Sequence, residues 1–159
     1  MKIAIVCVGK IKEKFFTDAI GEYSKRLSKY CNLEIYEVAD EKTLDNASDH
    51  EAELIKEKEG ERILKFIGDR DYVVALAIEG KQLSSVELAD YMEKLSVDGI
   101  SSIVFVIGGS LGLSQKVLSR ADYKLSFSKM TFPHQLMRVV LLEQIYRSFR
   151  IIKNEPYHK

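Results

Sequence analysis

Short apolar runs alternate with longer segments of helical period along this chain, and this alternation limits the possible folds more than any other feature. Five runs have the length and composition of strands: residues 3–8, 33–38, 72–78, 103–107 and 123–127. Five segments have the period of helices: residues 13–28, 49–67, 85–95, 115–121 and 133–152. This order predicts an α/β fold with a mainly parallel sheet flanked by helices.

Local signals support these boundaries. The nearly continuous apolar run at residues 72–78 predicts a strand buried on both faces, as parallel sheets require. Ser84, followed three residues later by Glu87, predicts a capping box at the start of the third helix. Ser114 is expected to cap the fourth helix, and Pro133 suits the first turn of the last helix.

The length of 159 residues fits one domain, residues 1–159, since a single core usually serves about 100 to 200 residues. No stretch reaches the roughly 18 apolar residues that span a bilayer, so we expect a cytoplasmic protein without membrane association. Cys7 and Cys31 are expected to be reduced thiols in or near the core. The three histidines are far apart in sequence, and we expect no metal site.

Charge is unevenly distributed along a chain of zero net charge. Residues 1–111 carry 15 Lys and Arg against 21 Asp and Glu, whereas residues 112–159 carry 9 against 3. The basic C-terminal part indicates a phosphate-rich partner, although solvated surface charge alone would give the same count. The acidic segment at residues 40–62 is interpreted as a loop followed by a solvated helix face.

A glycine-rich turn follows the fourth predicted strand in the string FVIGGSLGL, residues 105–113. Gly108, Gly109 and Gly112 let the backbone turn sharply and approach a ligand, although a strand-to-helix turn often needs glycine for geometry alone. No acidic residue follows at the spacing of a dinucleotide fold, and no Lys-Ser or Lys-Thr follows as in a P-loop. A lone Gly9 after the first strand argues against a methyltransferase of the ordinary Rossmann kind.

Two further segments carry chemistry. The loop that enters the last helix, in LSFSKMTFPHQLMR, offers hydroxyls, aromatic faces and free backbone N–H groups, and can hold a ligand that is partly apolar. His134 and Arg138, four residues apart, share one face of that helix, although a capped helix with exposed polar residues would look the same. The tail NEPYHK brings Tyr157, His158 and Lys159 together, which suits an RNA base and phosphate unless the tail is frayed filler with little packing.

These strings, with the opening MKIAIVCVGKIKEKFF and the segment SKMTFPHQLMRVVLLEQIYRSF, resemble the bacterial family of ribosomal large-subunit pseudouridine N3-methyltransferases, of the SPOUT class. The resemblance covers nearly the whole chain. It implies a C-terminal trefoil knot, a homodimer, S-adenosylmethionine as cofactor, and ribosomal RNA within the assembled ribosome as partner. It also implies that the cofactor pocket is lined by Leu76, Gly108, Phe127, Ser128, Lys129, Met130, Thr131 and Phe132, with Glu79 at its rim.

The reaction needs a proton acceptor, because N3 of pseudouridine is a weakly acidic imide that attacks only after losing its proton. We expect His134 or His158 to handle this proton, and Arg138 to stabilise negative charge or contact a phosphate. Tyr157 is expected to stack on the base. Two other functions fit the same residues: a non-catalytic RNA-binding or ribosome-assembly factor, and a small-molecule enzyme that holds a nucleotide at the glycine turn.

The last helix has more apolar positions than one face needs, which predicts that it forms the dimer contact. These positions are Leu136, Val139, Val140, Leu142, Ile145 and Phe149. The alternative is that all six belong to the core of their own chain.

Overall fold

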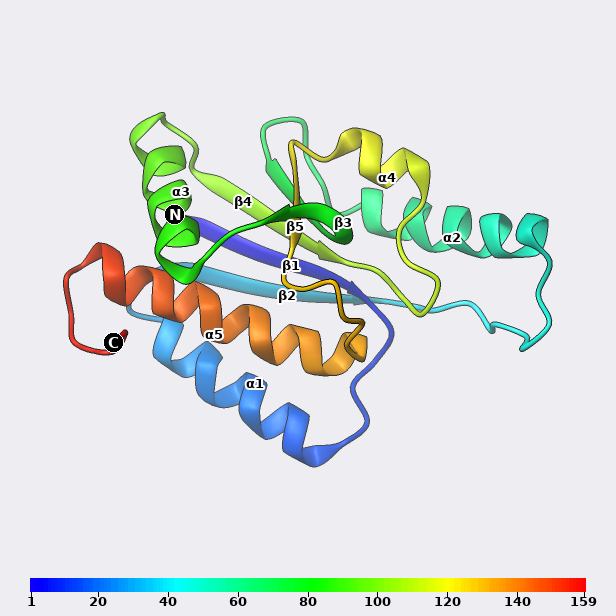
Figure 1. Cartoon of the computed structure of the whole chain (residues 1–159), viewed down its shortest axis with the longest axis horizontal. Coiled ribbons are helices and arrows are strands. Elements are labelled where there is room, and N and C mark those ends of the chain that lie inside the picture. The colour runs from blue at the N-terminus through cyan, green and yellow to red at the C-terminus, as the bar shows by residue number, and fades with distance from the viewer.

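A five-stranded parallel sheet organises the computed structural model, which describes all 159 residues (Figure 1). The strand order is β2-β1-β4-β3-β5, and every pairing is parallel. The elements follow one another as β1 Lys2–Val8, α1 Lys14–Leu27, β2 Asn32–Val38, α2 Asp49–Leu64, β3 Tyr72–Gln82, α3 Ser85–Val97, β4 Ser102–Ile107, α4 Gln115–Arg120, β5 Tyr123–Ser126 and α5 His134–Ile152. The predicted α/β class and all ten predicted elements are therefore confirmed, with ends shifted by up to four residues.

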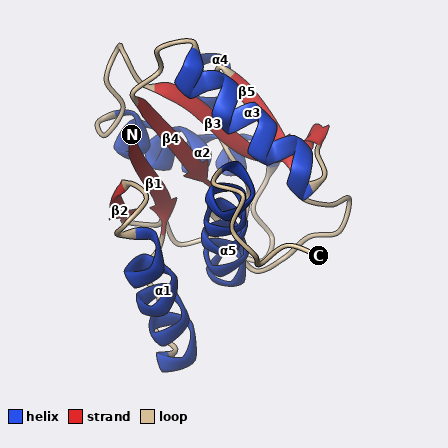
Figure 2. Cartoon of the chain, turned by 90° about the vertical axis from the view of Figure 1, so that its left-hand side faces the viewer, coloured by secondary structure: helices blue, strands red, loops and turns tan.

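Helices cover both faces of the sheet (Figures 1 and 2). Helices α1, α3 and α5 pack together on one face, over a cluster of 17 buried residues. Helices α2 and α4 cover the other face, over a smaller cluster of nine. No helix is long and apolar enough to cross a membrane. Cys7 is buried and Cys31 partly buried, both as free thiols, and burial raises the pKa of each to about 11.

Strand β3 departs from the expected burial at its far end. Val73, Val74 and Ala75 are buried, but Ile78 is 49% exposed, so the prediction of burial on both faces is wrong there. The reason is that pairing with β4 stops at Ala75, after which β3 runs beyond its central neighbour. Hydrophobicity alone carries no information on where a neighbouring strand ends.

Strand β5 pairs with β3 in two places. Leu125 lies opposite both Leu76 and Lys81, with a break in register between them, so the intervening residues of β3 leave the ladder beside β5. This second pairing extends β3 to Gln82, four residues past the predicted end. The trefoil knot implied by the resemblance stays a prediction, because strand order does not describe how one segment passes through another.

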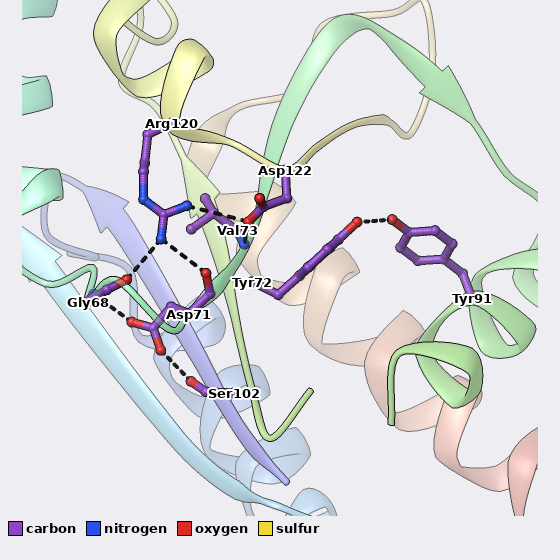
Figure 3. Close-up of polar contacts among 8 residues, drawn as sticks. All are labelled: Gly68, Asp71, Tyr72, Val73, Tyr91, Ser102, Arg120 and Asp122. Atoms are coloured by element: carbon purple, nitrogen blue, oxygen red, sulfur yellow. Dashed lines mark hydrogen bonds and ion pairs between the residues drawn. The ribbon is translucent and has the colours of Figure 1, made fainter. Parts of the chain in front are cut away.

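A polar network fixes the start of β3 to the segment that enters β5 (Figure 3). Arg120 donates hydrogen bonds to the carbonyl oxygens of Gly68 and Asp71 at 2.8 and 3.0 Å. The carboxylate of Asp122 accepts from the backbone N–H of Val73 at 2.8 Å. Asp71 also accepts from the hydroxyl of Ser102, at 2.7 Å, which ties in the start of β4. These contacts align the three strands whose far ends form the cleft described below.

The predicted caps are largely correct. Ser84 Oγ accepts from the N–H of Glu87, and the Glu87 carboxylate accepts from the N–H of Ser84, at 3.1 and 2.8 Å, which completes the capping box. Ser114 Oγ accepts from the N–H of Val117 at 3.3 Å. Pro133 has an extended ψ of 136° and precedes the first helical residue, so the prediction that it lies within the first turn is wrong by one position.

Replacing Ser84 by Ala is expected to lower the free energy of unfolding by about 1 kcal/mol, because the N–H of Glu87 loses its acceptor. Urea denaturation followed by circular dichroism measures this change. Ser96→Ala is the matched control, since Ser96 is an exposed position inside the same helix where alanine is the better helix former. Equal losses in the two variants would contradict a capping role for Ser84.

Candidate functional site at the carboxyl ends of the strands

A cleft of about 840 Å³ opens where β3, β4 and β5 end. Its walls come mainly from three segments: the far part of β3 at residues 76–79, the glycine turn at residues 107–113, and the loop from β5 into α5 at residues 125–134. In parallel sheets the carboxyl ends of the strands share one edge, which is where ligands bind in such folds. The topology therefore brings together three segments that are far apart in the sequence.

The cleft contains nearly all of the residues expected to bind the cofactor. Seven of the eight line it: Leu76, Gly108, Phe127, Ser128, Met130, Thr131 and Phe132. Lys129 is exposed and is not part of the wall, whereas Glu79 is. The sequence alone did not indicate Glu53 and Lys56 of α2, whose ion pair lies at the cleft. No sequence signal could have found them, because a charged pair on a helix is usually solvated.

The glycine turn serves its own geometry as well as the cleft. A side-chain carbon at Gly108 would lie 2.9 Å from the carbonyl carbon of Gly112 and 3.1 Å from a methyl group of Leu113. The space beside Gly108 is thus filled partly by the turn itself, and the purely structural reason for this glycine is supported. Because Gly108 also lines the cleft, its backbone remains accessible to a ligand.

A buried carboxyl group supports this turn from behind. Glu59 of α2 is 4% exposed, so the interpretation of this segment as a solvated helix face is wrong at this position. Glu59 accepts a hydrogen bond from the N–H of Glu41 at 2.9 Å, and its other oxygen, which has no partner, faces Gly109. Burial raises the pKa of the Glu59 carboxyl. A bulkier residue than glycine at position 109 would meet this carboxyl.

Short hydrogen-bonded turns preform the loop between β5 and α5. Ser126 Oγ donates to the carbonyl of Ser128 at 3.0 Å, and Ser128 Oγ accepts from the N–H of Met130 at 2.9 Å. Met130 and Phe132 are 73% and 38% exposed, although both are large apolar side chains. The loop therefore combines a fixed backbone with apolar surface that has no partner within the chain.

His134 and Arg138 share a helix face, but only one of them reaches the cleft. Arg138 is 1% exposed and donates to Glu37 at 2.6 Å and to the carbonyl oxygens of Val8 and Gly9 at 3.1 and 2.5 Å. The alternative of a capped helix with exposed polar residues is therefore wrong for Arg138. All three acceptors of its guanidinium are groups of the protein. Contact with an RNA phosphate would require breaking these hydrogen bonds.

His134 lies in the cleft wall and is half-buried. Burial, aided by the nearby charge of Arg138, lowers its pKa. Its Nδ1 atom is buried and has no hydrogen-bond partner in the chain. An uncharged imidazole has a lone pair, so this ring is suited to accepting a proton.

The C-terminal tail is packed against α5, so the alternative of a frayed tail with little packing is wrong. Tyr157 donates to Glu143 at 3.0 Å and packs edge-on against Tyr146, with ring centroids 4.9 Å apart. The guanidinium of Arg147 lies 4.7 Å from the centre of the Tyr157 ring and hydrogen-bonds His158 at 3.0 Å. Burial raises the pKa of Tyr157 to about 12.

The predicted site residues therefore fall into two groups. His134 begins α5 at the cleft, whereas Tyr157 and His158 lie near Arg147, roughly 20 Å further along the helix at 1.5 Å per residue. Within one chain the structure does not bring the tail to the cleft.

Comparisons with known proteins match this chain to methyltransferases along its whole length. Residues 1–158 match the family described as "Predicted SPOUT methyltransferase". This chain is similar over its whole length to proteins named "Ribosomal RNA large subunit methyltransferase H". It is 67% identical to the one from Clostridium botulinum, 64% to the one from Clostridium beijerinckii and 62% to the one from Clostridium kluyveri, over all of both chains.

A solved structure, "a probable methylase family protein" from Haemophilus influenzae, superposes with a TM-score of 0.54 at 14% identity, covering 99% of this chain and 70% of that one. At this identity the likeness concerns the fold alone. The family match and the full-length identities together show that this chain belongs to the SPOUT methyltransferase family.

Proposed function

We propose that this chain transfers a methyl group from S-adenosylmethionine to N3 of a pseudouridine in large-subunit ribosomal RNA. The observation that carries the proposal is the identity of 62 to 67%, over the whole of both chains, to proteins named for methylation of that RNA. The choice of pseudouridine N3 comes from the resemblance of the loop and tail motifs. The ribosome as substrate implies action in the cytoplasm.

The chemistry of the cleft fits S-adenosylmethionine, which would supply the methyl group. Leu76, Ile78 and Ile107 give apolar walls for an adenine ring. The hydroxyl groups and backbone of the β5–α5 loop give partners for the ribose and for the amino-acid end. Leu76, Gly108 and residues 127–132 would hold the cofactor, and Lys129 would contribute from the rim.

His134 is the best placed proton acceptor in its own chain, because its uncharged ring lines the cleft. Removal of the N3 proton makes the base nucleophilic, and transfer then depends mainly on alignment of the two reactants. Tyr157 would stack on the base. His158 would be a second candidate for accepting the proton. The guanidinium of Arg138 is already occupied by Glu37 and by the carbonyl oxygens of Val8 and Gly9, so its role would be to hold the chain around His134.

A homodimer would bring the two groups of residues together. Leu136 is 36% exposed and Val139 and Val140 are half-buried, which leaves an apolar surface at the cleft end of α5. Leu142, Ile145 and Phe149, also expected at the dimer contact, are buried in the core of their own chain, so that part of the expectation is wrong. Contact through the first half of α5 would place each tail at the partner's cleft.

A methylation assay tests the function directly. The protein is incubated with S-adenosylmethionine carrying a labelled methyl group and with free RNA, large subunits or whole ribosomes, and the modified nucleoside is identified by mass spectrometry. We expect label on N3 of one pseudouridine, with whole ribosomes as the preferred substrate. Binding of RNA without methyl transfer and without cofactor binding would instead identify a non-catalytic factor.

Replacing Ser128 by Ala is expected to weaken S-adenosylmethionine binding about two- to twelvefold, because the loop loses a hydrogen bond worth roughly 0.5 to 1.5 kcal/mol. Isothermal titration calorimetry measures the affinity. Ser101→Ala, just before β4 at the opposite edge of the sheet, is the control and is expected to bind as the wild type does. Unchanged affinity of the Ser128 variant would remove this hydroxyl from the binding loop.

Replacing Leu136 by Glu is expected to convert the dimer to a monomer of 18.2 kDa, because a carboxylate would be buried in the apolar contact. Light scattering coupled to gel filtration measures the mass. Val97→Glu, at a position 80% exposed at the end of α3, is the control and is expected to stay dimeric. A dimeric Leu136 variant would exclude this face of α5 as the contact.

Mixing two inactive variants tests whether the tail serves the partner's cleft. A chain that lacks Tyr157, His158 and Lys159 is refolded in equal amounts with a His134→Ala chain. About half of the dimers then contain one chain of each kind. Each of these has one cleft with both an intact His134 and the partner's tail. About a quarter of the number of sites in the wild type should therefore be active. A mixture with no methyl transfer would show that the tail acts in its own chain.

A further inference from the structure

An ion pair between a buried arginine and a partly exposed glutamate clamps the turn that follows β1. Arg138 donates to Glu37 at 2.6 Å, and the same carboxylate oxygen accepts from the N–H of Ile11 at 3.1 Å. The other end of the Arg138 guanidinium donates to the carbonyl oxygens of Val8 and Gly9. One arginine thus fixes both sides of the turn, while its own side chain is 2% exposed and that of Glu37 is 37% exposed.

The clamped turn packs directly against His134. Gly9 has a φ of +90°, a conformation that side chains rarely adopt. A side-chain carbon at this position would lie 3.3 Å from Cε1 of the His134 ring. The turn therefore fills one side of the imidazole, and the opening of the cleft lies on another.

We propose that Arg138, held by Glu37, is a positioning residue that fixes the Gly9 turn against His134 and so sets the place of this ring in the cleft. The role in catalysis rests on the proposed function, because it assumes that His134 accepts the proton of the base. The clamp itself rests only on the contacts above. A guanidinium suits this task because its planar fork reaches a carboxylate and two carbonyl groups at once, which an ammonium group cannot do.

Of the two members of the clamp, Arg138 acts directly on the charge of the ring, and Glu37 acts through its pairing with Arg138. The charged groups that act on His134 are Arg138 on its own helix, which lowers its pKa, and Asp40 after β2, which raises it. Removing the positive charge of Arg138 must therefore raise the pKa of His134. Removing the negative charge of Glu37 leaves Arg138 less compensated and must lower it.

Nuclear magnetic resonance of the histidine rings tests this arrangement, since the chain has only three histidines. The variants are Arg138→Gln and Glu37→Gln, with His134→Gln used to assign the signals. We expect the pKa of His134 to move up in the first variant and down in the second, and the signals of the other two histidines serve as internal controls. Shifts of His134 in the same direction, or none in either folded variant, would overturn the proposal.

Arg138→Lys keeps the positive charge but lacks the planar guanidinium that reaches three acceptors at once. Of the variants at this position it changes the buried charge least, so it is the one most expected to fold. It should leave the pKa of His134 near the wild-type value and lower kcat for methyl transfer by up to roughly 100-fold, because the ring is misplaced. Its affinity for S-adenosylmethionine should be unchanged. A Lys variant with full kcat would show that Arg138 has only a structural role.

The two proposals fail in different ways. A wild-type protein that transfers no methyl group would contradict the proposed function. The titration of His134 would still test whether Arg138 and Glu37 act on this ring. Opposite pKa shifts are not expected from a general loss of stability, which circular dichroism of each variant measures in parallel. Wild-type transfer combined with an unmoved His134 titration would end the proposal for Arg138 alone.

Discussion

Strands β1 and β4 form the centre of the sheet and are buried on both faces, and most of the architecture depends on this burial. Ile3, Val6, Ile103 and Val106 are all 0% exposed. Parallel strands without a solvated face can be joined only by crossover segments, which here are mostly helices. All five strands therefore end at the same edge of the sheet, and the cleft forms where three of them stop.

Helix α5 connects this sheet to the chemistry. Its middle residues, such as Leu141 and Ile145, fill the larger hydrophobic cluster, so the helix is fixed along its length. Its first residue, His134, lies in the cleft, and the tail is held near its other end by Arg147 and Glu143. Because a rigid helix separates the two groups, a reaction that used both would need two chains, which is the physical reason for proposing a dimer.

Arginine positions show why charge along a sequence differs from charge on a surface. The C-terminal part is basic, but Arg138 is buried against Glu37, and Arg147 and Arg150 are paired with glutamates. Burying an arginine is costly unless its hydrogen bonds are satisfied. The two terminal nitrogens of Arg138 offset part of this cost through one carboxylate and two carbonyl groups, while its buried Nε has no partner in the chain. Part of the positive charge that the sequence offers for binding RNA is therefore already used within the chain. Arg138, for example, holds the turn beside His134.

The sequence by itself determined the ten elements and the parallel sheet, because hydrophobic period and caps act over short stretches. Its resemblance to a known family named eight residues for a cofactor pocket, and seven of them line the cleft. Only the tertiary structure decided the far end of β3, the burial of Glu59 and Arg138, and the packing of Tyr157 on α5. Each of these depends on which distant segment lies opposite. A residue's own neighbours in sequence set its backbone, whereas the charge and exposure of its side chain are set by contacts across the fold.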